Sequence, residues 1–242
     1  MIKFFRTIRQ NLLMENKTGK YLKYAIGEIL LVIIGILIAV SINGWNEDRK
    51  LKIEEQSILI DLKQEVTSNL KDLEKVIEEN EKSFAAAGEM RALFKDREAF
   101  DEMPDSSFRS LFLKMNTNWT FDPRNGILNS IISSGQINQL SNKELKYLLA
   151  SNKEMTLDTF ENSMKIEAQR DEMIYSTLDN ARIIEDGKIV GRDWKSFYDH
   201  GAFRTLTTWL FYYTREGGLE EEHELKEALE RIIELIDQDI EK

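Results

Sequence analysis

The sequence contains no cysteine, and its 242 residues include only two histidines and two prolines. Without cysteine, disulfides, thiol catalysis and cysteine-ligated metals are excluded, so a domain outside the cytoplasm depends on its packed core. Two histidines leave little material for histidine-based chemistry. A glycine-rich phosphate loop and the HExxH and GxSxG motifs are also missing. We therefore expect no enzyme activity, no cofactor and no bound metal.

Charge is almost absent from one long stretch. Residues 24–42 contain a single charged side chain, Glu28, and residues 29–40 are apolar apart from Gly35. A helix of about 20 residues crosses the roughly 30 Å hydrocarbon layer of a bilayer. We therefore predict a transmembrane helix over residues 24–42.

A cleaved signal peptide is the alternative, because Ala39-Val40-Ser41 loosely resembles a small-residue cleavage site. Three features favour the uncleaved anchor. The basic region before the stretch is 23 residues long, the stretch reaches almost full span length, and Trp45 follows at the position of an interfacial anchor.

The flanking charge predicts the orientation. Residues 1–23 carry a net charge of +5, whereas residues 43–242 carry −14. Positive flanks stay in the cytoplasm, so we expect an inner-membrane protein with a cytoplasmic N-terminus and a periplasmic C-terminal domain. The acidic excess argues against a nucleic-acid partner.

The first segment alternates apolar and basic side chains at helical spacing. This pattern predicts an amphipathic helix lying on the lipid headgroups, while a basic flank that only fixes topology remains the alternative. The residues expected at the membrane interface are Lys3, Phe4, Phe5, Arg6, Arg9 and Trp45.

The remaining pattern predicts a mainly all-α protein in four parts. Residues 1–23 form the cytoplasmic segment, 24–42 the transmembrane helix, 43–87 a stalk helix, and 88–242 a helical periplasmic domain that packs on the stalk. A two-stranded coiled coil is an alternative for the stalk, supported by only about three heptads. The apolar stripe of the stalk, interrupted by Asn69, comprises Leu59, Leu62, Val66, Leu70, Leu73, Val76 and Ile77.

Further elements follow from local signals. Residues 95–126 are predicted to be irregular apart from a short helix over 107–115, and a helix over 127–134 is expected to end at Gly135 in a left-handed cap. The Ser141–Glu144 capping box opens a helix over 144–153. Residues 183–190 contain the one sequence signal for a tight β-hairpin, and a last helix is predicted to begin near Leu219.

One face of the predicted span combines Glu28 with two small residues, Gly35 and Ala39. Small residues four apart allow close approach of another helix, so this face is a candidate helix–helix contact. Two other interpretations remain open: Glu28 is a shallow acid tolerated at the cytoplasmic edge, or it carries protons in an energised complex.

Two further groups of side chains are candidate sites. One group is a candidate partner or ligand patch formed by Trp119, Phe121, Trp209 and Tyr212. The aromatic residues from Phe203 to Tyr213 recur at helical spacing, which is more typical of a core. The threonines among them are compatible with a β-strand as the alternative. His223 with Glu220 and Glu227 resembles a metal cluster, but an acidic first helical turn explains it more simply.

Two patches of sequence carry a family resemblance. The first is the IRQNLL…KYAIGEI…IGILIA…INGWNE pattern of residues 1–50. The second runs from Trp119 through Phe121-Asp122-Pro123 and Gly126–Ser130 to Leu149, departing from it at Ser151-Asn152-Lys153, where a tryptophan is common. The chain thus resembles a family, a domain of unknown function, of single-span inner-membrane proteins from flavobacteria-like Gram-negative bacteria. The resemblance implies a helical periplasmic domain and no assigned activity.

The sequence therefore predicts a membrane-anchored, non-catalytic scaffold or adaptor module. Its expected partners are membrane lipid and either its own copies or another membrane or periplasmic protein. The alternatives are an accessory subunit of an energised inner-membrane complex that uses Glu28, and a ligand-sensing domain with its site near Trp209.

Overall fold

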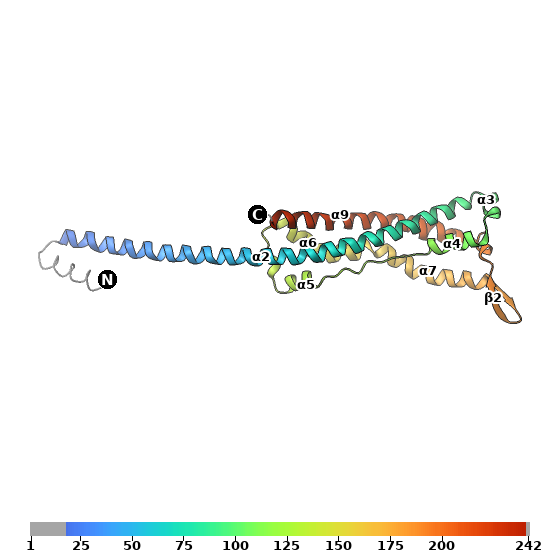
Figure 1. The fold of residues 1–242 in the computed structure, drawn as a ribbon, viewed down its shortest axis with the longest axis horizontal. Coiled ribbons are helices and arrows are strands. Elements are labelled where there is room, and N and C mark those ends of the chain that lie inside the picture. Colours follow the sequence, from blue (N-terminus) through green and yellow to red (C-terminus); the bar gives the residue numbers. More distant parts are fainter. Residues whose placement is uncertain (1–17, 241–242) are drawn as a thin grey trace. The chain divides into compact units, whose positions relative to one another are not determined.

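The computed structural model describes residues 18–240 and confirms the mainly helical fold (Figure 1). It divides into two units, residues 1–55 and 56–242, which are considered separately. The elements, in chain order, are α2 (Thr18–Leu93), α3 (Arg97–Glu102), α4 (Asp105–Met115), α5 (Gly126–Ser133), η1 (Gln136–Gln139), α6 (Lys143–Thr159), α7 (Glu161–Asn180), β1 (Arg182–Glu185), β2 (Lys188–Arg192), η2 (Trp194–Phe197), α8 (Gly201–Thr208), η3 (Trp209–Thr214) and α9 (Arg215–Ile240).

In the first unit, the described part of α2 carries the apolar stretch of residues 24–42. Its large aliphatic side chains are exposed, as those of a soluble core helix would not be. By length and composition alone, this helix is long and apolar enough to cross a membrane.

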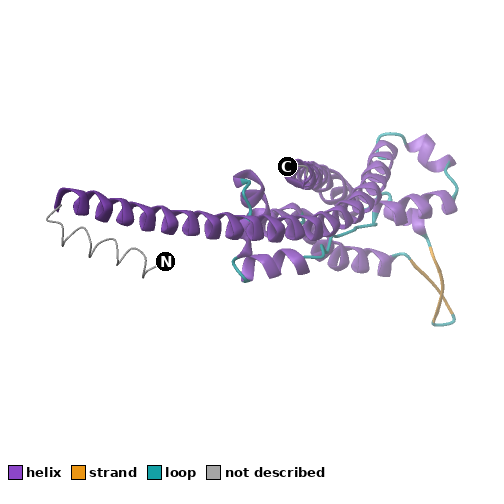
Figure 2. Ribbon diagram, turned by 60° about the vertical axis from the view of Figure 1, so that its left-hand side comes forward, coloured by secondary structure: helices purple, strands orange, loops and turns teal. Residues whose placement is uncertain are grey.

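The second unit is a helical bundle in which the later part of α2 lies beside α9 (Figures 1 and 2). Salt bridges and hydrogen bonds join the two helices along their length, from Lys63–Asp237 at 2.5 Å to Asn80–Glu222 at 2.8 Å. The predicted stripe is confirmed, because each of its seven side chains lies in the core or packs against it.

The bundle contains two separate apolar cores. The first joins α2 to α5, α6 and the greater part of α9. The second joins the end of α2 to α3, α4, α8 and η3, and is rich in aromatic rings such as Phe108, Phe203 and Phe211. Between them lies a layer of buried polar side chains, described below.

Local signals account for several boundaries. Gly135 has φ +77° and follows α5, which confirms the left-handed cap. The turn of the β1–β2 hairpin has positive φ at both Asp186 and Gly187, as a type I′ turn requires. Since α6 ends at Thr159, the predicted end at residue 153 was too early.

Other expectations were wrong. Residues 95–126 include a second helix, α3, which begins after Asp96, whose carboxylate accepts a hydrogen bond from the Ala99 amide at 3.0 Å. Asn142, rather than Ser141, is the N-cap of α6 and accepts from two amides. The threonine-rich run forms helix α8 instead of a strand, and η3 is a π-helix.

Candidate functional site

A face of α2 in the second unit carries polar side chains where a core helix would usually carry apolar ones. Glu65, Asn69, Asn80 and Ser83 are separated by four, eleven and three residues, spacings that place them on one side of a helix. Asn69, Asn80 and Ser83 are buried, and each side chain therefore requires a hydrogen-bond partner.

Their partners are backbone groups of the loop that follows α4. Asn80 donates to the Trp119 carbonyl at 3.1 Å and accepts from the Trp119 amide at 3.0 Å. Asn69 does the same for Arg124, at 2.8 and 2.9 Å. Each carboxamide thus pairs with one residue through both backbone groups, as a neighbouring β-strand would.

This pairing holds residues 117–125, which we call the clamped segment, in an extended form along α2. Eleven helical residues separate Asn69 from Asn80 and rise about 16 Å. Five residues separate Trp119 from Arg124 and span about 16 to 18 Å only when fully extended. The two asparagines therefore pull this part of the segment nearly straight.

Both ends of the clamp are also fixed to α2. Ser83 donates to the carbonyl of Met115, the last residue of α4, at 2.8 Å. Glu65 accepts from the amides of Ile127 and Leu128 at 2.7 and 2.9 Å, and so caps the first turn of α5 with a negative charge.

Along the outer edge of the clamped segment runs an apolar groove of about 370 Å³, bounded on its other side by α6 and α7. Leu157 and Met164 are exposed at its surface, and Phe121 packs on Phe160 with ring centroids 6.0 Å apart. We call this the segment groove. It is lined by Thr120, Phe121, Asp122, Pro123, Asn125, Lys153, Thr156, Leu157, Phe160, Met164 and Glu167.

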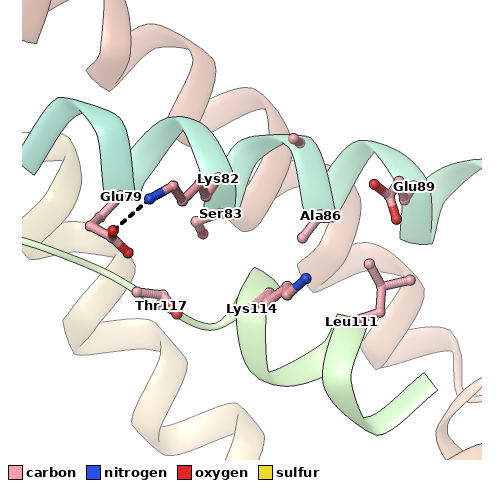
Figure 3. A pocket seen from close by; sticks show the side chains of 9 residues that line it. Glu79, Lys82, Ser83, Ala86, Glu89, Leu111, Lys114 and Thr117 are labelled. Carbon is pink, nitrogen blue, oxygen red and sulfur yellow. Dashed lines mark hydrogen bonds and ion pairs between the residues drawn. The ribbon is translucent and has the colours of Figure 1, made fainter. Parts of the chain in front are cut away.

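A second hollow, of about 380 Å³, lies between α2 and α4 (Figure 3). Two of its charged lining residues form an ion pair, since the Lys82 ammonium lies 2.8 Å from Glu79, and it also lies 2.7 Å from Glu78. Hydrogen bonding by Lys82 lowers the pKa of the Glu78 carboxyl, and the two carboxylates raise the pKa of Lys82. This arrangement is an exposed ion-pair cluster of the kind common on helix surfaces.

The polar layer between the two cores is built around Arg215, the first residue of α9, and Glu222, two turns further along the helix. Their side chains are 1% and 0% exposed. Arg215 donates to Ser163 at 3.1 Å and to the Asn118 side chain. Glu222 accepts from Asn80 at 2.8 Å. One network thus links α2, the clamped segment, α7 and α9.

Burial shifts both ionisable groups of this layer toward their neutral forms. Desolvation raises the pKa of Glu222 to about 7, although the charge of Arg215 opposes the shift. Desolvation likewise lowers the pKa of Arg215 to about 10, against the attraction of Glu222. Within the described residues, Glu222 Oε2 and Arg215 Nε have no hydrogen-bond partner, so the layer is incompletely satisfied.

Aromatic side chains gather on another part of the surface, around the π-helix η3. Trp209 and Tyr213 are 65% and 44% exposed, with ring centroids 5.4 Å apart. The Arg91 guanidinium lies 3.8 Å from the Tyr212 ring centroid and donates to the Tyr213 hydroxyl at 3.3 Å. Phe203 lies in the second core, as predicted. Tyr213 was also predicted to lie in the core, and its exposure shows that this prediction was wrong.

The predicted patch is consequently divided between two surfaces. Trp119 and Phe121 belong to the clamped segment, and Phe121 lines the segment groove. Trp209 and Tyr212 belong to η3, where Tyr212 packs on Phe84 of α2 with centroids 4.7 Å apart.

The predicted membrane residues lie in the first unit. Gly35, Ala39 and Trp45 are exposed on α2, and a side chain at Gly35 would meet nothing within 4 Å. Glu28, on the same helix, is half-buried. The interface residues Lys3, Phe4, Phe5, Arg6 and Arg9 lie outside the described residues.

The His223 metal cluster is not assembled in the described part of the chain, where no three histidine or acidic side chains are placed to hold an ion. The His223 imidazole instead lies 3.2 Å from the Glu81 carboxylate of α2, and both side chains are about half exposed.

Sequence reasoning missed the residues that organise this site. The apolar pattern of the helix marks Asn69 only as an interruption of the stripe, and it does not single out Asn80, Glu65 or Arg215. A usable signal was present, because Asn69 and Asn80 share one helix face eleven residues apart in a stretch otherwise suited to burial.

Comparison with known proteins gives a family but no function. The model of a family of unknown function, DUF6090, matches residues 28–158, more than half of the chain, and the chain belongs to this family. The match covers α2 from Glu28 onward, the clamped segment, α5 and nearly all of α6. No curated protein and no solved structure matches the chain.

Proposed function

We propose that this member of the DUF6090 family is a membrane-anchored adaptor without catalytic activity, whose helical domain binds another protein in the periplasm. The observation that carries the proposal is the segment groove. One wall is an extended chain that two asparagines of α2 hold in place, while Ser83 and Glu65 fix the residues on either side of it, so the groove exists before any partner binds. Preformed sites lose less conformational entropy on binding than flexible ones.

The lining of the groove suits an apolar segment of a protein. Leu157 is 57% exposed, and exposed aliphatic side chains beside aromatic rings are typical of the centre of an interface. Met164 is a flexible side chain that adapts to differently shaped partners. Lys153, Asp122 and Glu167 supply charges of both signs at the rim, where they orient a partner more than they strengthen binding.

The anchor gives this recognition its location. The apolar part of α2 supports a single membrane span, and the basic flank before residue 24 supports a cytoplasmic N-terminus. The face formed by Glu28, Gly35 and Ala39 is proposed as the contact with a neighbouring span, either from a second copy or from the partner complex. An adaptor of this kind confines its partner to the membrane surface and so raises its effective concentration.

The test is site-specific photo-crosslinking in the native membrane. A photoreactive residue at Leu157 should crosslink to one protein, and a charge introduced by Met164→Glu should abolish that crosslink without changing expression. Tyr147 is the matched control, because it is 74% exposed on the same helix but outside the groove. Equal crosslinking from Leu157 and Tyr147, or an unaffected crosslink in Met164→Glu, would refute the proposal.

A further inference from the structure

The surface around η3 contains a third hollow, whose chemistry differs from that of the segment groove. It has a volume of about 260 Å³ and lies beside the exposed Trp209. It is lined by Gln169, Thr205, Leu206, Trp209, Leu210 and Thr214. We propose that this hollow binds one pyranose ring of a glycan, with Trp209 as the stacking surface.

The lining favours a neutral, hydroxyl-rich ligand over a charged one or a wholly apolar one. Gln169 provides an amide, and Thr205 and Thr214 provide two hydroxyl oxygens that can accept hydrogen bonds, because their protons are donated to backbone carbonyls. None of the six lining residues is charged. Leu206 and Leu210 are buried and form an apolar floor. A pyranose ring has the same division, with hydroxyls around its edge and a less polar face of C–H groups.

Trp209 has a solvent-exposed aromatic ring on which the C–H face of a pyranose can stack. The π-face of an aromatic ring carries negative potential, so it attracts the weakly positive C–H hydrogens of a sugar. Tyr213 extends the aromatic surface at 5.4 Å, with the two rings tilted by 48°. Arg91 donates a hydrogen bond to the Tyr213 hydroxyl and packs on the Tyr212 ring, and so fixes the orientation of the Tyr213 ring.

The backbone geometry supports a built site. The segment Trp209–Thr214 is a π-helix within an otherwise α-helical run, a costly distortion that is frequent at functional sites. The Thr214 hydroxyl donates to the Trp209 carbonyl at 2.9 Å, five residues earlier, and so stabilises the widened turn.

Size distinguishes a single ring from a larger ligand. Pockets for drug-sized molecules range from about 300 to 1,000 Å³, so a hollow of about 260 Å³ accommodates one ring and leaves the rest of a chain outside. We therefore expect an oligosaccharide to bind through one residue, with modest affinity and little dependence on chain length beyond two or three sugars.

The experiment uses the full chain in lipid nanodiscs, titrated with chitotetraose, cellotetraose and maltotetraose. Binding is followed by tryptophan fluorescence and by calorimetry. At least one glycan should saturate the protein, Trp209→Ala should weaken it at least tenfold, and Gln169→Ala should weaken it several-fold. The control is Trp119→Ala at another exposed tryptophan, which should change affinity less than twofold.

Because Trp209 is exposed, Trp209→Ala should unfold at the same temperature as the parent protein, which separates lost binding from lost folding. Absence of saturable binding by all three glycans, or undiminished binding by Trp209→Ala, would overturn the proposal. Loss of a protein crosslink in Trp209→Ala without any glycan binding would also overturn it, and would assign this surface to a protein instead. The outcome is independent of the segment groove, which shares no lining residue with this hollow.

Discussion

Asn80 is the residue on which most of the second unit converges. Its carboxamide holds both backbone groups of Trp119 and one oxygen of Glu222, so it joins the clamped segment to α9 through α2. A residue that makes three hydrogen bonds while fully buried is replaceable only by one of the same shape and polarity. This is why a helix that otherwise follows the pattern of a core helix carries an amide at this position.

Asn80→Ala should therefore be strongly destabilising. It removes three hydrogen bonds and leaves the Trp119 backbone and the Glu222 carboxylate without their partner. We expect a loss of about 2–4 kcal/mol in the free energy of unfolding, measured by urea denaturation. The matched control is Asn129→Ala on the exposed side of α5, which should stay within about 0.5 kcal/mol of the parent protein. A small effect at Asn80 would show that the clamp is not an important source of stability.

Glu222 makes stability depend on pH in an unusual direction. Because burial raises its pKa from 4.5 to about 7, the folded state binds the proton more tightly than the unfolded state does. The free energy of unfolding should consequently fall as the pH rises from about 4.5 to about 7. At about 1.4 kcal/mol per pKa unit, the change is on the order of 3 kcal/mol. Burial also raises the pKa of Glu221, which contributes with the same sign.

The measurement is a series of denaturation curves between pH 5 and pH 8. Glu222→Gln should flatten the slope, whatever its effect on stability at a single pH, while Glu220→Gln at an exposed site on the same helix should leave the slope unchanged. A parent protein whose stability rises through this window would contradict the assignment of a buried, readily protonated Glu222.

At the scale of elements, helices with strong periodic patterns were predicted well and irregular backbone was not. The stripe of α2 and the apolar side of α9 follow directly from spacing, since burial of one face fixes which residues recur. The Asp-Gly pair predicted the hairpin because few residues adopt its φ angles. The clamped segment has no such local signal, since its conformation is set by side chains about 40 to 60 residues earlier in the chain.

The same reasoning explains why the candidate site was only partly visible. Trp119 and Phe121 were predicted as part of a partner or ligand patch, but the other wall of the groove comes from α6 and α7, whose placement depends on tertiary packing. The π-helix was likewise invisible, because one extra residue per turn leaves the composition of a helix unchanged.

Glu65 provides a test of how the clamp organises a neighbouring element. Its carboxylate accepts from the amides of the second and third residues of α5, so Glu65→Ala should cost about 1 kcal/mol and speed amide exchange at Ile127 and Leu128. Asp61→Ala, at an exposed position one turn earlier, is the control and should change neither quantity. Unchanged exchange in Glu65→Ala would mean that α5 is held by its apolar contacts alone.

For the whole molecule, the proposed function requires that the two sides of the apolar stretch face different compartments. The absence of cysteine makes this easy to examine, because a single introduced thiol has no background. Tyr147→Cys is exposed on α6 and should react with a membrane-impermeant maleimide in intact spheroplasts. Asn16→Cys, before the apolar stretch, should react only after lysis, because the positive flank favours the cytoplasm.

The control is lysis, after which both thiols should be labelled equally. Protein that pellets with membranes and resists carbonate extraction should show the same pattern, since a span of about 20 apolar residues is held by the hydrocarbon layer itself. Labelling of Asn16→Cys in intact spheroplasts would show that the orientation is the reverse of the one proposed. Release by carbonate would show that the apolar stretch does not anchor the protein in the membrane. Either result would leave the segment groove intact but place its partner in another compartment, so the topology decides where a binding protein should be sought.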